Sequence, residues 1–381
     1  MVRDAAKQLR RRPWARWLAG VALGVSLAGA CQEVASWPPG ETTGEEAFVV
    51  QIAPTVVLLS IDGLAPRFVE DLMSQGLLPG FARLQAEGAF THNARTEPQS
   101  SYTLPNHISM ISGRPASSLT NEEGVLPHLV VDNHDPGDGV TVHQYNPELG
   151  YTPSVFDVVH DRGGYTSLFS GKSKFMLIRR SYASPAGAAD LVPPDDGQNK
   201  IDDFDVMGDT LTLTAKCLRK LQLAMQLRPQ APRFAMLHVA DPDVHGHAYG
   251  WGSESYLHAV MLADAVVQQL LSAFDDGRIG SGRLILTADH GGVDTAHNDP
   301  TNPAIAAIPF YLWGHGVPAG DLYALAGLTR RDPGPQFVDS NQLSPIRNGD
   351  AANLALWLLG LGEIPGSAYR GFRVELLSDL E

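Results

Sequence analysis

Cysteine is scarce in this chain of 381 residues, which contains only Cys31 and Cys217. If Cys31 is lipidated or removed, no internal disulfide can form, and the fold must depend on its core and on metal ions. Positive charge is also scarce, because 28 Lys and Arg stand against 42 Asp and Glu, a net charge of -14. This balance argues against a nucleic-acid-binding surface, which is usually basic.

Acidity does not exclude an anionic small-molecule substrate, because bound metal ions reverse the local field. The hydrophobic share of 44% is that of a globular protein with a substantial core. The chain also has 13 histidines, several of them beside aspartates. Metal-dependent chemistry on a small anion therefore fits the composition.

The first 31 residues are typical of a bacterial export signal. Basic residues between positions 7 and 16 precede an apolar stretch at 17–30 that ends in SLAGAC. The small residues before Cys31 resemble a lipoprotein cleavage box, so we expect export to the periplasm or cell envelope. Membrane attachment through lipidated Cys31 is one outcome, and a plain secretory signal or an uncleaved anchor is the other. Residues 32–50, rich in Pro, Gly, Glu and Thr, predict a flexible tether.

Continuous apolar runs that end in polar loops predict a parallel sheet. Such runs lie at 55–63, 163–172, 232–243, 282–292 and 308–317, and helical spacing occurs at 66–88, 211–227 and 255–274. The alternation predicts an α/β fold with a doubly wound, mostly parallel central sheet and helices on both faces. We expect a single domain over 51–381, with long loops around 120–150 and 173–205 forming a small cap.

Acidic and histidine side chains follow three of the predicted strands, as Asp62, Asp243, and Asp289 with His290. Ligands gather outside the carboxyl ends of strands in open α/β sheets, so these residues are expected to meet in space. Burying several carboxylates without a counter-charge costs several kcal/mol per ion. Mixed oxygen and nitrogen ligands suit zinc or a similar divalent cation.

The segment ADPDVHGHAYG offers two aspartate–histidine pairs at a spacing of four residues. Asp241 pairs with His245 in one interpretation, and Asp243 with His247 in the other. Either pair presents one carboxylate and one imidazole to a cation, and the spacing leaves both open.

A hydroxyl group stands at the predicted helix start in SSYTLPNHISMISG, where Thr103 precedes a proline and Asn106. Threonine at such a position is either a helix N-cap or a nucleophile. A threonine hydroxyl is a poor nucleophile at neutral pH unless a base or metal activates it. No Ser-His-Asp arrangement is evident in the sequence, so a metal is the expected activator.

The order of three motifs resembles the alkaline phosphatase superfamily, and most closely its nucleotide pyrophosphatase/phosphodiesterase branch. These motifs are SIDG at 60–63, YTLPNHISMISG at 102–113, and PDVHGHAYG at 242–250 with ADHGG after it. The likeness covers 55–317. It implies an alkaline phosphatase-like fold and a hydrolase of small-molecule phosphoesters. The reaction would pass through a phosphothreonine at a two-zinc site, with Mn²⁺ as the alternative metal.

The resemblance also implies residue roles. Thr103 is the expected nucleophile, and Asn106 is expected to contact the phosphoryl oxygens. One zinc is expected to be held by Asp62, Thr103, Asp289 and His290, and the other by Asp243, His247 and His297. This selects the second aspartate–histidine pair over Asp241 and His245. His315 in WGHGV is the rival of His297 as the last ligand.

Substrate choice is less constrained by the sequence. The C/S-x-P-x-R frame of sulfatases does not occur at the equivalent place, so a dedicated sulfatase is not expected. Lys172 and Lys174 in SGKSKF follow a strand end and are candidate contacts for a substrate's distal charge. We expect a phosphodiesterase, with a phosphate monoesterase or phosphonate hydrolase as alternatives. A non-catalytic exported binding lipoprotein is the alternative from another class.

Overall fold

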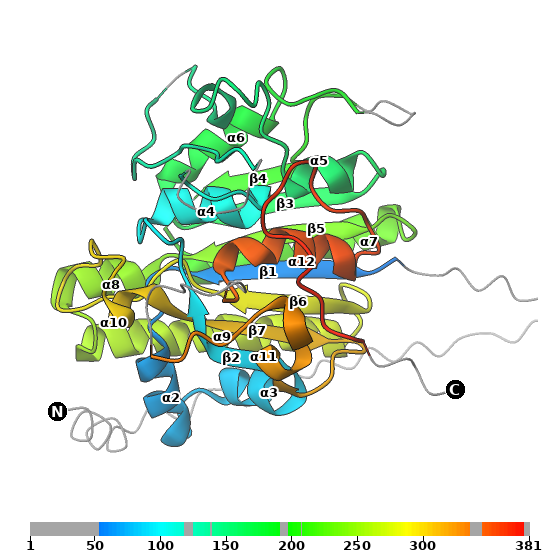
Figure 1. The fold of residues 1–381 in the computed structure, drawn as a ribbon. Coiled ribbons are helices and arrows are strands. Elements are labelled where there is room, and N and C mark those ends of the chain that lie inside the picture. The colour runs from blue at the N-terminus through cyan, green and yellow to red at the C-terminus, as the bar shows by residue number, and fades with distance from the viewer. Residues whose placement is uncertain are drawn as a thin grey trace, which may run out of the picture. The chain divides into compact units, whose positions relative to one another are not determined.

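In the part of the chain that the structure describes, eight strands form one sheet in the order β4-β3-β5-β1-β6-β7-β2-β8 (Figure 1). The strands are β1 (Thr55–Ile61), β2 (Ala89–Arg95), β3 (Tyr165–Ser170), β4 (Asp203–Val206), β5 (Arg233–Val239), β6 (Gly282–Thr287), β7 (Ala307–Gly314) and β8 (Gly320–Asp321). From β4 to β6 all neighbours are parallel, whereas β7 runs antiparallel to both β6 and β2. The predicted mostly parallel α/β sheet is confirmed.

The computed structural model describes residues 53–117, 125–137, 139–190, 197–206, 208–335 and 345–376. The predicted export signal at 1–31 and the predicted tether at 32–50 lie outside the described residues. Export and lipidation therefore stay predictions.

Helices cover both faces of the sheet. The helices are α2 (Pro66–Ser74), α3 (Pro79–Glu87), α4 (Thr103–Ser112), α5 (Val155–His160), α6 (Met176–Tyr182), α7 (Thr210–Leu227), α8 (Asp241–Tyr249), α9 (Glu254–Asp275), α10 (Pro303–Ala306), α11 (Leu322–Leu325) and α12 (Ala351–Leu358). On one face α12 packs against α4, α5 and the central strands, and on the other α9 packs against α3 and α7. All seven residues of β1 are buried as a result.

Within the described residues, α9 is long and apolar enough to cross a membrane by length and composition alone. More than half of its most apolar window is buried inside the protein. Several of its apolar side chains, such as Val260 and Leu270, are fully buried. These contacts are those of a core helix.

The five strands expected from apolar runs are present as β1, β3, β5, β6 and β7. Strand β2 was not expected, because its sequence AFTHNAR lacks a continuous apolar run. The segment 173–205 was expected to be loop, and this is wrong in part, since it contains α6 and most of β4. Strand β4 is an edge strand with half-buried residues, so its sequence carries little apolar signal.

Adjacent strands place the candidate ligands. Strands β5, β1 and β6 are neighbours, with Ile61 opposite Val239 and Ser60 opposite Thr287. Their carboxyl ends therefore lie at one edge of the sheet, where Asp62, α8 and Asp289 follow directly. This register brings together residues that are far apart in the chain.

Leu59, near the centre of β1, is fully buried between the two helical layers. We expect Leu59→Ala to lower the free energy of unfolding by about 2–5 kcal/mol, because it removes buried methyl groups and leaves a cavity. Leu223→Ala on the exposed side of α7 is the control and should change it by less than about 0.5 kcal/mol. Urea unfolding followed by circular dichroism measures both, and equal effects would contradict the assignment of β1 as the core strand.

Candidate metal centre and nucleophile

The turn after β1 carries the first carboxylate. Gly63 adopts a positive φ of 69°, and a Cβ atom there would lie 3.0 Å from Cα and Cβ of Asp243. Its N–H donates to Oδ1 of Asp289 over 3.0 Å. Glycine in SIDG thus permits α8 and the loop after β6 to approach Asp62 closely.

Asp62, Asp289 and His290 form one buried group whose ligand atoms lie within 4.8 Å of one another. Nε2 of His290 is 3.5 Å from Oδ1 of Asp62 and 3.3 Å from Oδ2 of Asp289. All three side chains are fully buried. The group supplies two carboxylates and one imidazole, a set that can hold a divalent cation.

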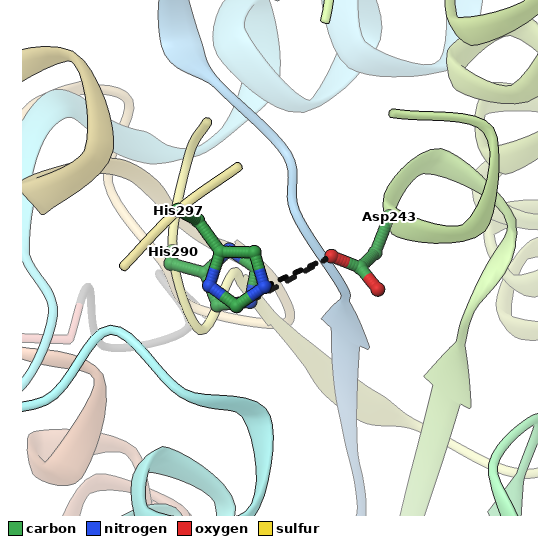
Figure 2. A group of neighbouring side chains, drawn as sticks. All are labelled: Asp243, His290 and His297. Carbon is green, nitrogen blue, oxygen red and sulfur yellow. Dashed lines mark ion pairs between the residues drawn. The ribbon is translucent and has the colours of Figure 1, made fainter. Parts of the chain in front are cut away.

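Asp243, His290 and His297 form a second such group (Figure 2). Oδ1 of Asp243 lies 3.6 Å from Nε2 of His297 and 3.9 Å from Nε2 of His290, so its carboxylate faces both rings. The two rings stack at 3.6 Å between centroids. His247, one turn after Asp243 on α8, brings its Nε2 to 3.4 Å from the same oxygen.

The tautomers of these histidines follow from their other ring nitrogen. Nδ1 of His247, His290 and His297 lies 2.6–2.9 Å from the carbonyl oxygens of Thr295, Gly291 and Ser101 respectively. A carbonyl oxygen only accepts, so each Nδ1 donates and each neutral ring presents its Nε2 lone pair to the cluster. Two of these lone pairs, on His247 and His297, face each other over 3.0 Å.

Several buried atoms of the cluster have no hydrogen-bond partner in the part of the chain that the structure describes. They are Oδ1 of Asp62, Oδ1 of Asp243, Oδ2 of Asp289 and Nε2 of His290. Buried acceptors without a donor are costly and rare in folded proteins. Because all four are acceptors that converge on the same space, a metal cation fits the site better than a hydrogen-bond donor at each atom.

Burial governs the protonation of the site. It lowers the pKa of His290 to about 4 and that of His297 to about 3, so both rings are neutral at pH 7. Burial and the adjacent charge of Asp62 raise the pKa of Asp289 well above its usual value. Burial also acts to raise the pKa of Asp62, but Lys172 and His238 outweigh it and hold that pKa well below its usual value. Neutral imidazole is the form that binds a metal.

Lys172 places a positive charge beside the candidate nucleophile. Its Nζ lies 2.6 Å from Oδ2 of both Asp62 and Asp243, and 3.4 Å from Oγ1 of Thr103. Burial alone would lower the pKa of Lys172, but the charges of the surrounding carboxylates outweigh it and raise the pKa. The Thr103 hydroxyl therefore stands at the edge of the carboxylate cluster.

The family model described as type I phosphodiesterase / nucleotide pyrophosphatase matches residues 56–311, about two thirds of the chain. The chain belongs to this family. Human ectonucleotide pyrophosphatase/phosphodiesterase family member 1 is 23% identical over 272 residues, which cover 68% of this chain and 26% of that protein. GPI ethanolamine phosphate transferase 1 of Aspergillus fumigatus is 30% identical over 131 residues, which cover 33% of this chain and 12% of that protein. The matched regions thus span about a quarter or less of the length of these relatives.

Two solved structures share the fold. The periplasmic domain of phosphoethanolamine transferase EptC from Campylobacter jejuni superposes with a TM-score of 0.53 and 11% identity, covering 86% of this chain and 96% of that domain. An inactive threonine-to-alanine variant of murine ectonucleotide pyrophosphatase/phosphodiesterase 5 in complex with AMP superposes with a TM-score of 0.52 and 12% identity, covering 82% of this chain and 96% of that one. The alkaline phosphatase-like fold expected from the motifs is confirmed.

In this phosphodiesterase-family chain Thr103 is the first residue of α4, and the cap position is occupied by Tyr102 in an extended conformation. The side chain at the cap position makes no capping hydrogen bond. The interpretation of Thr103 as an N-cap is therefore wrong. Thr103 is only 1% exposed, and its hydroxyl oxygen faces Lys172.

Asn106 directs its amide into the protein, although it was expected to contact a phosphoryl group. Its Oδ1 accepts from Thr96, Glu97 and Asn348, and its Nδ2 donates to the carbonyls of Ser100 and Tyr102. Every hydrogen-bonding position of this buried amide is used within the protein. The bonds thus argue for a structural role in holding the turn before Thr103.

Asn133 contacts the start of α4, which the sequence did not indicate. Its Oδ1 accepts from the backbone N–H of Leu104 over 3.0 Å and from Nζ of Lys174 over 2.9 Å. Burial and the charge of Lys172 lower the pKa of Lys174. Asn133 was missed because it lies in the segment 120–150 interpreted as cap, where its only sequence signal was a polar VDNHDP turn.

His238 was also missed. It lies within β5, fully buried, and its Nε2 is 3.0 Å from Oδ2 of Asp62, while its Nδ1 lies 3.2 Å from the Ser170 hydroxyl. A single histidine inside the apolar strand RFAMLHV carries no distinctive signal in the sequence. Its contact with Asp62 depends on the pairing of β5 with β1.

The structure separates the competing ligand candidates. Asp241 accepts a hydrogen bond from Thr210, and His245 pairs with Ser255 over 2.7 Å, so neither joins the cluster. His315 follows the antiparallel strand β7, and its N–H donates to the carbonyl of Gly282 at the start of β6. This is the opposite edge of the sheet, so His315 lies away from the other ligands.

We expect Asp243→Asn to lose one of about two bound divalent cations per chain, because it removes the carboxylate that faces His247 and His297. Asp241→Asn is the matched control and should keep both, since an amide oxygen still accepts from Thr210. Metal content after dialysis is measured by inductively coupled plasma mass spectrometry. Loss from Asp241→Asn with retention in Asp243→Asn would overturn the assignment.

Proposed function

We propose that this chain is an exported phosphodiesterase of the nucleotide pyrophosphatase type, with Thr103 as its nucleophile. The observation that carries the proposal is the position of Lys172. One ammonium nitrogen lies within 3.4 Å of Oγ1 of Thr103 and 2.6 Å of carboxylate oxygens of Asp62 and Asp243. The Thr103 hydroxyl therefore lies next to a space whose surrounding carboxylates favour a positive charge.

Two divalent cations would occupy this space: Asp62, Thr103, Asp289 and His290 would hold one, and Asp243, His247 and His297 would hold the other. Zinc suits the mixed oxygen and nitrogen set, and Mn²⁺ is the alternative. When bound, the cations supply Lewis acidity that lowers the pKa of the Thr103 hydroxyl and stabilises charge on the leaving oxygen. The orphaned acceptors of the cluster support this assignment.

Thr103 then performs an in-line displacement at phosphorus. The Thr103 hydroxyl loses its proton to solvent, and its Oγ1–P bond forms while the bond from phosphorus to the leaving oxygen breaks. This leaves a phosphothreonine and releases the leaving group as an alkoxide or, after it takes up a proton from solvent, an alcohol. Water hydrolyses the new bond and restores the hydroxyl. The backbone N–H of Leu104, the residue after Thr103, donates to Oδ1 of Asn133, which also accepts from Nζ of Lys174. A phosphoryl oxygen that takes the place of the Asn133 oxygen would be stabilised by these two donors.

The relatives support the same reaction. The murine structure is described as an inactive threonine-to-alanine variant bound to AMP, which suits a threonine nucleophile and a nucleotide ligand in that protein. We extend the threonine role to Thr103 on the geometry above. Export is proposed from the N-terminal pattern and from the periplasmic placement of the EptC domain, with lipidation of Cys31 as the proposed anchor.

A phosphate monoesterase is the second candidate, and two lysines favour it. Lys172 lies beside the Thr103 hydroxyl, and Lys174 donates to Asn133, which contacts the start of α4. A monoester carries one more negative charge than a diester at neutral pH. Extra positive charge beside the phosphoryl group stabilises the dianion more than the monoanion. Relative rates on the two ester types decide between the candidates.

We expect Thr103→Ala to lower hydrolysis of bis-p-nitrophenyl phosphate by orders of magnitude, because the nucleophile is removed. Metal content should stay near normal. Thr214→Ala is the control, since Thr214 is a buried threonine on α7 whose hydroxyl donates to the carbonyl of Thr210. Retention of more than about a tenth of the wild-type rate by Thr103→Ala would refute the mechanism.

Lys174→Met should discriminate between ester types. We expect kcat/KM for p-nitrophenyl phosphate to fall about tenfold or more, and kcat/KM for the diester to fall less. The reason is that the positive charge of Lys174 stabilises the dianionic monoester more than the monoanionic diester. Lys220→Met, which breaks a partly exposed ion pair with Asp203, is the control. Equal losses on both esters would show that Lys174 does not select the monoester.

A further inference from the structure

The segment after the family match packs against the nucleophile helix. The match ends at residue 311, whereas the 3₁₀ helix Asn348–Asp350 lies against α4. Just before it, the N–H of Arg95 donates to the carbonyl of Ile346 over 2.8 Å, and Arg347 donates to the carbonyl of Thr96 over 2.7 Å. This C-terminal stretch is therefore joined to the turn that leads into Thr103.

Asn348 links two parts of the site through one amide nitrogen. Its Nδ2 donates to Oδ1 of Asn106 over 2.7 Å. The same nitrogen lies 3.3 Å from the carbonyl oxygen of Asp289 and 3.4 Å from that of Ala288. Asn348 is fully buried, so water does not readily take over these bonds when the side chain is removed.

Asn106 carries the link to the nucleophile. Its Nδ2 donates to the carbonyl of Tyr102 over 2.9 Å, directly before Thr103. On the other side, Asp289 is a member of the carboxylate cluster. The path from Thr103 to Asp289 through Asn106 and Asn348 thus consists of hydrogen bonds between buried groups.

We propose that Asn348 is a positioning residue that sets the placement of Thr103 relative to Asp289. The proposal rests on the proposed function in treating Thr103 as the nucleophile and Asp289 as a metal ligand. A neutral amide NH₂ is suited to this task, because its two hydrogens serve acceptors on two separate elements at once. The reactive geometry of the site then depends on a residue outside the family match.

The test compares Asn348→Ala and Asn348→Asp with the wild-type holoenzyme. Alanine removes the hydrogen bonds of the Asn348 amide. Aspartate instead places a carboxylate oxygen against the side-chain oxygen of Asn106 and the carbonyl oxygens of Ala288 and Asp289. For both, we expect kcat on bis-p-nitrophenyl phosphate to fall about 10- to 100-fold with KM within about threefold, since misplacement of reacting groups costs rate more than binding. The visible absorption of the cobalt(II)-loaded protein should also change, because Thr103 and Asp289 shift at the metal.

Asn353→Ala is the matched control. Asn353 is a buried asparagine of α12 that donates to the carbonyl of Tyr369 and the hydroxyl of Ser367. Neither partner belongs to the groups of candidate metal ligands. It should lose stability in urea unfolding but keep kcat and the cobalt spectrum. The proposal is overturned if folded Asn348→Ala keeps kcat within about threefold of wild type, or if Asn353→Ala loses as much at equal stability.

Failure of the proposed function has a different signature. In that case Thr103→Ala would keep the wild-type rate. The positioning role of Asn348 would then be tested by the absorption spectrum of the cobalt(II)-loaded protein and not by the rate. An unchanged spectrum in Asn348→Ala would then overturn the positioning role, and a changed one would support it.

Discussion

The structure depends on one constraint, which is the burial of several carboxylate oxygens and imidazole nitrogens close together at one edge of the sheet. Three carboxylates and three imidazole lone pairs converge where β5, β1 and β6 end, and most of them are shielded from water. Such a cluster costs several kcal/mol per ion unless an opposite charge is present. Lys172 provides one such charge, and the orphaned acceptors that remain are suited to divalent cations.

The surroundings of the cluster hold each ligand in one orientation. Backbone carbonyls fix the tautomers of His247, His290 and His297, and His238 holds one oxygen of Asp62. Contacts of this kind are common around metal ligands. Hydrogen bonds within the protein therefore hold these candidate ligands in one orientation.

The expectations that succeeded concerned local patterns. Apolar runs located five strands of the sheet. The strand ends also predicted that Asp62, Asp289 and His290 would lie together, as they do, while their role as metal ligands stays a prediction. The sequence did not indicate the direction of some polar side chains or the partners that they contact. Asn106 turns its amide into the protein because the turn at 96–102 offers it several partners, and Asn133 reaches α4 from a loop with weak periodicity.

The sequence by itself determined the alternation of strands and helices, because this alternation follows from hydrophobic spacing. Once the strands are located, the sequence also shows which acidic and histidine residues follow them. The motif resemblance had already selected Asp243 with His247, and the tertiary structure places both at the cluster. Only the tertiary structure decided that His315 lies at the opposite edge and that Asn348 meets both Asn106 and Asp289. Those outcomes depend on strand order, strand direction and long-range hydrogen bonds, and no local stretch of the chain encodes them.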